Sequence, residues 1–153
     1  MMKPQVWMHG KWVGDMDLET EDDWLIWEAD YERYIMSFVD LAIETGVEMI
    51  CIGTEFKIAA VKREEFWRRL IKRIRKDYNG LLTYSANWDS YKMIPFWDAL
   101  DFVGISAYFP LTDASTPNVY YLKYKWSPIK KRLDRELQSI YFVLNKNHGV
   151  NIC

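Results

Sequence analysis

A single glutamate, Glu55, stands where a short apolar segment ends, a position from which a carboxylate can do chemistry. The segment reads ICIG from Ile50 to Gly53, and Thr54 separates it from Glu55. A continuous apolar run of this length predicts a buried strand rather than a strand with one wet face. A carboxylate just past such a strand can act as a general acid or base, or it can be an ordinary salt-bridge partner. Taken alone, the residue leaves both roles open.

Aromatic, amide and charged side chains also gather in the segments that follow the other predicted strands. The four segments read WMHGKW over 7–12, GTEF over 53–56, NWDSY over 87–91 and AYFPL over 107–111. Flat aromatic rings stack on sugar faces, and Asn, Asp, His and Lys side chains hydrogen-bond hydroxyl groups. A collar of this composition suits a polysaccharide, although any one exposed Trp or Tyr is more often a packing residue.

The elements that must position these side chains alternate between strands and helices. Apolar residues at three- and four-residue steps predict a long amphipathic helix over 18–45. Thr20 with Asp23 gives a capping-box-like start, and Gly46 is the expected stop. The remaining expected elements are strands over 47–52, 81–86 and 102–106, helices over 66–78, 95–100 and from Ser127 to a cap at Gly149, and strand candidates over 5–8 and 150–153.

Two features of the predicted helices have ordinary structural interpretations. His148 lies near the end of the last predicted helix and is expected to be a cap or a surface residue. The helix over 66–78 has a basic outer face, which is expected to be solvated. The residues of that face are Arg68, Arg69, Lys72, Arg73 and Lys76.

Alternating strands and helices with apolar strands predict a parallel sheet covered by helices. A doubly wound sheet and a (β/α)8 barrel both fit this order. No Gly-x-Gly-x-x-Gly or Gly-x-x-x-x-Gly-Lys-Ser/Thr motif follows a predicted strand, and this absence favours the barrel. A barrel typically needs about 250 residues. The chain has 153 residues, with four predicted strands and the start of a fifth, so an incomplete barrel in one domain over 1–153 is expected.

Composition limits the classes of partner. The chain is 50% hydrophobic and 27% charged, which is typical of a globular domain. With 20 basic and 22 acidic residues, it lacks a strong field for nucleic acid or an anionic membrane. Cys51 and Cys153 have no metal-ligand or redox spacing. No membrane span or signal peptide is recognised, so a cytoplasmic location is expected for the sequence as written, with export of a longer parent left open.

Four longer stretches, taken together and in order, resemble glycoside hydrolase family 113. They read KPQVWMHGKWVGD over 3–15, ICIGTEF over 50–56, LLTYSANWD over 81–89 and FWDALDFVGISAYFPL over 96–111. The family consists of retaining β-mannanases with a (β/α)8 barrel whose two catalytic glutamates end the fourth and seventh strands. The resemblance implies that this chain holds strands three to six with their helices and the start of strand seven.

The resemblance also implies roles for the candidate site residues. Glu55 matches the acid/base, and Tyr108 resembles the tyrosine that hydrogen-bonds the nucleophile. Substrate-binding roles fall to Asn87, Trp88 and Asp89 near the scissile bond and to Trp7, His9 and Lys11 on the adjoining rim. The implied double displacement needs a proton donor whose pKa is raised toward neutrality and a second carboxylate roughly 5 to 5.5 Å away. No metal or organic cofactor is implied, because carboxyl groups suffice.

The chain departs from the family where the second carboxylate is expected. A stretch resembling lFTEiGY should follow the seventh strand, but the sequence ends at 150–153. We therefore expect a fragment of an enzyme for β-1,4-linked mannan-type polysaccharide, inactive alone and with open sheet edges that need a partner. Three alternatives remain: a non-catalytic oligosaccharide-binding remnant, half of a split enzyme completed by another chain, and an α/β protein with no sugar role.

Overall fold

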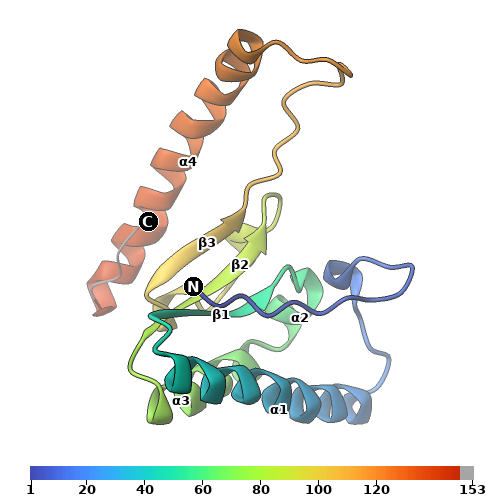
Figure 1. The fold of residues 1–153 in the computed structure, drawn as a ribbon, viewed down its shortest axis with the longest axis vertical. Coiled ribbons are helices and arrows are strands. Elements are labelled where there is room, and N and C mark those ends of the chain that lie inside the picture. Colours follow the sequence, from blue (N-terminus) through green and yellow to red (C-terminus); the bar gives the residue numbers. More distant parts are fainter. Residues whose placement is uncertain (149–153) are drawn as a thin grey trace.

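Three parallel strands and four α-helices make up the fold of this computed structural model, which describes residues 1–148 and their side chains as far as Ile140 (Figure 1). The strands are β1 (Met49–Thr54), β2 (Leu81–Asn87) and β3 (Phe102–Ser106), and they lie in that order in one sheet. The helices are α1 (Glu21–Thr45), α2 (Lys57–Lys62), α3 (Glu64–Asp77) and α4 (Val119–His148). The predicted parallel sheet with helices is confirmed.

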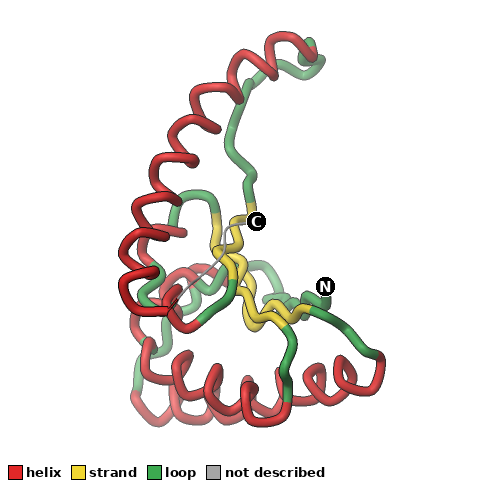
Figure 2. Tube along the Cα trace, turned by 90° about the vertical axis from the view of Figure 1, so that its left-hand side faces the viewer, coloured by secondary structure: helices red, strands yellow, loops and turns green. Residues whose placement is uncertain are grey.

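The helices cover the sheet unevenly. Figure 1 shows α1 and α3 side by side beneath the sheet, with α4 running past β3 and extending well beyond it. Figure 2, turned by a right angle, shows the long helix α4 to the left of the strands and the other helices below them. None of the helices within residues 1–148 is both long and apolar enough to cross a membrane.

Helix α1 begins and ends where its capping residues predict. Thr20 Oγ1 accepts a hydrogen bond from the backbone N–H of Asp23 at 3.1 Å, which satisfies one of the free donors of the first turn. Gly46 takes the left-handed conformation, with φ 67°, and closes the helix. The predicted capping residues are thus confirmed, although the helix begins at Glu21 rather than at Leu18.

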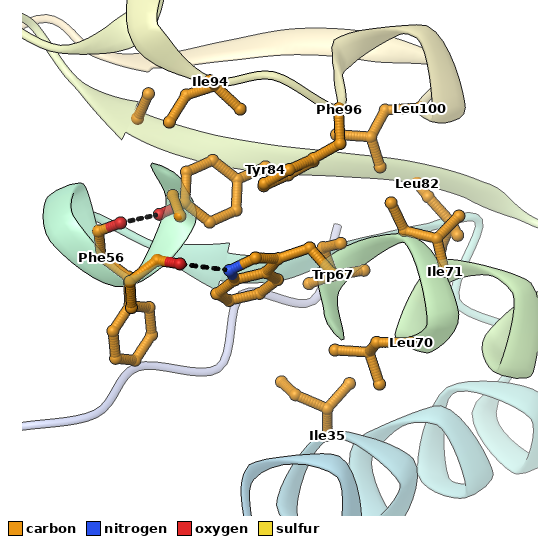
Figure 3. Close-up of a cluster of buried hydrophobic side chains, with 14 of the residues drawn as sticks. Ile35, Phe56, Trp67, Leu70, Ile71, Leu82, Tyr84, Ile94, Phe96 and Leu100 are labelled. Atoms are coloured by element: carbon orange, nitrogen blue, oxygen red, sulfur yellow. Dashed lines mark hydrogen bonds between the residues drawn. The ribbon is translucent and has the colours of Figure 1, made fainter. Parts of the chain in front are cut away.

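The core lies between the helices and the face of the sheet that they cover (Figure 3). Trp67 of α3 is completely buried and stacks on Phe96 with the ring centroids 5.5 Å apart. The edge of Tyr84 from β2 meets the Trp67 ring at 5.3 Å. These large rings fill the space between α3 and β2, so they fix the distance of that helix from the sheet.

The last helix begins earlier than the sequence predicts. Residue Asn118 caps α4, because its Oδ1 accepts the N–H of Tyr120 at 2.8 Å and its carbonyl accepts the N–H of Leu122 at 3.0 Å. Pro128, which was expected to open the helix, lies inside it, where it removes one backbone donor. The loop after Tyr108 therefore ends at Asn118, earlier than the predicted helix start at Ser127 implies.

The N-terminal strand expected over 5–8 is not present. Met2 pairs with β1 instead: its N–H donates to the carbonyl of Met49 at 2.8 Å, and its carbonyl accepts the N–H of Cys51 at 2.9 Å. Pro4 has no N–H to donate, which explains why the pairing stops there. The helix expected over 95–100 is only a 3-10 turn, Trp97–Ala99. The expected cap at Gly149 and the strand over 150–153 lie outside the described residues.

The basic face of α3 is only partly solvated as expected: Arg69, Lys72 and Lys76 are exposed, whereas the other two residues of the face are half-buried. Arg68 pairs with Asp98 at 2.8 Å, and Arg69 pairs with Glu28 of α1 at 2.8 Å. Arg75 pairs with Asp101, just before β3. The partners are far away in the sequence, and a helical charge pattern alone gives no sign of them. This face therefore ties α3 to α1 and to the segment that enters β3.

Glu28 is the buried member of this network, and its removal is the clearest test of it. Arg63 donates to one carboxylate oxygen at 2.6 Å and Arg69 to the other at 2.8 Å, while the Glu28 side chain is only 6% exposed. Glu28→Ala leaves Arg63 without this partner, so we expect the free energy of unfolding in urea to fall by about 3 kcal/mol. The control Asp30→Ala, in an exposed pair on the same helix, should change it by less than about 0.5 kcal/mol. Equal effects would contradict the network.

Candidate functional site

The backbone at the end of β1 leaves regular strand geometry just before Glu55. Cys51 lies opposite Thr83, whereas Thr54 lies opposite Ser85, so β1 fits one extra residue into this interval. Such a bulge bends a strand and re-aims the side chains that follow it. Glu55 itself has φ 60°, and among the described residues it is the only non-glycine with a positive φ. A glutamate in this left-handed region is strained, and strain of this kind concentrates at functional sites.

Gly53 explains why the bulge can form at this place. A methyl group added there would lie 2.7 Å from Tyr84 Cε2 and 2.8 Å from Trp67 Cη2, both of them buried ring atoms. No larger residue fits unless these rings move. The glycine of the Gly-Thr before Glu55 therefore has a packing reason.

Three buried rings hold the backbone on both sides of Glu55 by hydrogen bonds from their polar tips. Tyr31 Oη donates to the carbonyl of Ile52 at 3.0 Å. Tyr84 Oη donates to the carbonyl of Phe56 at 3.1 Å, as Figure 3 shows. Trp67 Nε1 donates to the carbonyl of Ala59 at 3.2 Å. Burial raises the pKa of both tyrosines well above its ordinary value, so both stay protonated donors.

The side chain of Glu55 lines a small hollow at the carboxyl end of β1. The hollow has a volume of about 230 Å³, and its lining includes Trp7, Lys11, Trp12 and Tyr108. Trp7 is 85% exposed and Tyr108 is 74% exposed, so neither is a core residue. The structure thus brings together four of the candidate site residues, because Glu55, Tyr108, Trp7 and Lys11 line one surface. His9 is exposed on the same segment but is not part of the lining.

Asn87, Trp88 and Asp89 form a second group after β2. Asn87 Nδ2 donates to Asp89 Oδ1 at 3.0 Å, and the Trp88 ring meets the edge of Phe109 at 5.5 Å. Trp88 and Asp89 line a separate hollow of about 270 Å³, together with Tyr91, Lys92 and Arg132. The described residues therefore hold the candidates in two neighbouring places, each at the carboxyl end of a strand.

Asp89 is held in its ionised form by a neighbouring cation. Lys57 Nζ donates to Asp89 Oδ2 at 2.8 Å, and this contact lowers the pKa of Asp89 below its ordinary value. A carboxyl in this state is a poor proton donor at neutral pH. The geometry gives Asp89 the role of a fixed acceptor that orients Asn87.

One residue of the site was missed by the sequence analysis. Trp12 Nε1 donates to Glu55 Oε2 at 3.0 Å, and this is the one side-chain hydrogen bond to Glu55 among the described residues. Trp12 belongs to the aromatic segment over 7–12, but its spacing does not distinguish it from Trp7. Only the fold shows which of the two indoles reaches the carboxylate.

The chain is similar to solved mannanase structures. It is 36% identical to the GH113 β-mannanase AaManA from Alicyclobacillus acidocaldarius, solved in complex with ManMIm, with a TM-score of 0.63 over 67% of this chain and 34% of that one. It is 31% identical to a GH113 β-1,4-mannanase solved as a complex, with a TM-score of 0.67 over 98% of this chain and 44% of that one. A further GH113 β-1,4-mannanase structure gives 31% identity and a TM-score of 0.63, over 94% and 41%.

The parallel α/β fold of this chain is thus shared with part of each of these glycoside hydrolases. The family model for Glycoside Hydrolase Family 113 matches residues 1–146, and the chain belongs to that family. A search of curated proteins gives no match. The chain spans less than half the length of each of the three mannanases.

Tyr84→Phe tests whether the buried rings support the backbone beside Glu55. The change removes one of two donors to the buried carbonyl of Phe56, which still accepts the N–H of Ala60 at 2.9 Å, so we expect the free energy of unfolding to fall by about 1 kcal/mol. Tyr34→Phe is the matched control, because Tyr34 Oη donates to the carbonyl of Gln5 at 3.2 Å at an exposed position. It should cost less than about 0.5 kcal/mol. The same loss from both variants in urea unfolding would contradict this support.

Lys57→Met tests the electrostatic state of Asp89. Without the cation, the pKa of Asp89 should rise toward the ordinary value of about 3.9. Because the folded pKa is lowered, the pair stabilises the wild type above about pH 4, and this contribution is lost as the pH falls through the folded value. Both partners are one-third exposed, so the gap in stability at neutral pH should be below about 1 kcal/mol. An Asp89 carboxyl whose NMR titration does not change in the variant would contradict the pairing.

Proposed function

We propose that this chain is the part of a retaining β-mannanase that carries the acid/base, Glu55. The observation that carries the proposal is the setting of that residue. A strained backbone at the end of β1 projects the carboxyl toward a hollow lined by the exposed rings of Trp7 and Tyr108. An isolated salt-bridge partner needs no such setting, and none of the ion pairs among the described residues involves Glu55.

The proposed place of the chain in the barrel follows from the resemblance of its strand-end motifs to those of the family. We assign β1, β2 and β3 to the fourth, fifth and sixth of eight barrel strands, and the Met2 segment beside β1 to the third. Residues 1–153 then form one partial barrel domain. The three mannanases support a partial barrel, because up to 98% of this chain matches while at most 44% of any one of them is covered.

The proposed substrate is β-1,4-linked mannan or an oligosaccharide derived from it. Similarity to proteins described as β-1,4-mannanases supports this class. Trp7 offers an almost fully exposed indole as a stacking platform beside Glu55, and Lys11 offers donors for sugar hydroxyls. His9 lies next to them on the rim. Asn87, Trp88 and Asp89 are assigned to the sugar nearest the scissile bond, and Tyr108 to the second carboxylate.

In the proposed mechanism, Glu55 gives its proton to the glycosidic oxygen as the bond from that oxygen to the anomeric carbon breaks. A second carboxylate attacks the same carbon from the opposite face and forms a glycosyl ester. Glu55, now ionised, then takes a proton from a water molecule whose oxygen attacks the anomeric carbon and displaces the ester. The two carboxyls must lie roughly 5 to 5.5 Å apart for this course.

We further propose that the second carboxylate comes from polypeptide outside residues 1–153. A segment of the same parent protein or a separate chain can supply it, and the latter case makes this chain half of a split enzyme. Residues 1–153 alone should then bind sugar weakly and hydrolyse nothing. The small coverage of the matched mannanases supports this division of the site.

The test is reducing-sugar release from β-1,4-mannan by soluble chain, alone and with a fragment that bears the remaining barrel strands. We expect no release alone, release on completion, and a loss of roughly 10²- to 10⁴-fold in Glu55→Gln. Glu48→Gln is the matched control, because Glu48 is an exposed residue just before the opposite end of β1. Hydrolysis that survives Glu55→Gln would contradict the acid/base role.

The exposed aromatics favour one other candidate, a non-catalytic oligosaccharide-binding remnant. Trp7 and Tyr108 are 85% and 74% exposed, and stacking on them needs no carboxyl chemistry. This candidate predicts mannooligosaccharide binding that Glu55→Gln leaves unchanged, with no hydrolysis even after completion. Calorimetric measurement of mannooligosaccharide binding to the unchanged chain and to Glu55→Gln, together with the hydrolysis assay, distinguishes this candidate from the acid/base proposal.

A further inference from the structure

The hydrogen bond between Trp12 and Glu55 constrains the carboxyl group more than its distance alone suggests. Trp12 Nε1 lies 3.0 Å from Glu55 Oε2. An indole N–H only donates, so the oxygen that it contacts must present a lone pair. When the carboxyl is protonated, the proton is then best placed on Oε1. The contact therefore makes the two carboxyl oxygens of Glu55 chemically different.

The indole of Trp12 is held in place by the turn that follows it. A 3-10 turn covers Val13–Asp15, and the N–H of Asp15 donates to the carbonyl of Trp12 at 3.1 Å. Val13 and Gly14 are buried, which anchors this turn to the core. A methyl group on Gly14 would lie 2.3 Å from Trp12 Cη2, so the ring lies directly against the glycine. The sequence Trp-Val-Gly thus positions one indole N–H.

We propose that Trp12 is the positioning residue of the acid/base, which it holds by Oε2 so that Oε1 carries and delivers the proton. This inference rests on the proposed function. When the proton passes from Oε1 to the departing glycosidic oxygen, the Oε1–H bond breaks and the carboxylate forms. Hydrogen bonds to an ionised acceptor are roughly twice as strong as neutral ones. The Trp12 contact therefore strengthens as the proton leaves and stabilises the transition state.

The same reasoning fixes the sign of a pH effect. A donor favours the ionised carboxyl, so loss of the Trp12 N–H lets Glu55 keep its proton to a higher pH. The other ionisable groups around Glu55 come from several elements: Lys11 of the N-terminal segment, Tyr84 of β2 and Tyr108 after β3. All of them remain in a variant that changes only Trp12.

The hydrogen bond between Trp12 and Glu55 can be tested without measuring hydrolysis. In a chain labelled with ¹⁵N at the indoles, the Trp12 N–H resonance should move with pH as Glu55 titrates, and this movement should vanish in Glu55→Gln. Trp67 and Trp97 provide internal controls, because their indoles donate to the backbone carbonyls of Ala59 and Tyr91 at 3.2 and 2.8 Å. Their resonances should stay fixed. A Trp12 resonance that is equally fixed, in folded protein, overturns the inference.

The catalytic role of Trp12 is tested in the completed enzyme, which is the chain combined with a fragment that bears the remaining barrel strands. Replacing Trp12 by β-(3-benzothienyl)alanine exchanges the N–H for sulfur and keeps the ring shape. We expect kcat to fall roughly 10-fold, less than on loss of the acid itself, and the alkaline limb of the pH profile to move to higher pH. Trp12→Phe should behave in the same way. The same exchange at Trp126, a half-buried residue of α4, should change neither quantity.

The outcomes separate the two claims. An unchanged kcat and pH profile in the Trp12 variants, where Glu55→Gln abolishes hydrolysis, overturns the positioning role and leaves the proposed function intact. Hydrolysis that does not depend on Glu55 overturns the proposed function and with it the catalytic meaning of the contact. A titrating Trp12 resonance together with the shifted pH profile supports both.

Discussion

The site depends on how closely two buried rings approach the backbone of β1. Trp67 and Tyr84 leave no room for a side chain at position 53, and their polar tips hold the carbonyls of Ala59 and Phe56. Between these fixed points, β1 carries an extra residue, and Glu55 takes a left-handed conformation. The ring packing therefore sets the direction of a carboxyl at the rim of the sheet. The packed core keeps Glu55 in this strained conformation, which a residue at a strand end could not maintain alone.

The aromatic richness of the sequence has two separate uses in the structure. One set of rings, which includes Trp67, Tyr84 and Phe96, fills the core between helices and sheet. Another set, represented by Trp7 and Tyr108, lies exposed at the end of the sheet where Glu55 also lies. The first set gives rigidity and the second gives a surface on which sugars can stack. A composition of 16% aromatic residues contains both and cannot separate them.

Much of the fold could be predicted from the sequence, because local signals match the final structure. Thr20 and Gly46 cap α1 as their residue types indicate, and the strand over 102–106 was predicted with its true bounds. Errors arose where a local signal competed with a stronger one elsewhere. Pro128 suggested a helix start, but Asn118 provides the cap earlier. The apolar residues over 5–8 suggested a strand, but Pro4 ends the pairing after Met2.

Most residues of the candidate site could be predicted from the sequence, but the contacts between them could not. Residues that follow parallel strands meet at one end of a sheet, so Glu55 and Tyr108 could be grouped without coordinates. The bond from Trp12 depends on a turn packed at Gly14, and the ionised state of Asp89 depends on Lys57. These contacts span 43 and 32 residues of sequence, and no short motif encodes them.

A structure of the completed barrel with Glu55→Gln and a bound mannooligosaccharide would test the central claim most directly. If Glu55 is the acid/base, the side chain at position 55 lies roughly 2.6 to 3.2 Å from a glycosidic oxygen. The neighbouring sugar rings then face Trp7 or Trp88. An oligosaccharide bound to the aromatic surface with position 55 out of hydrogen-bonding reach of every glycosidic oxygen would contradict the claim.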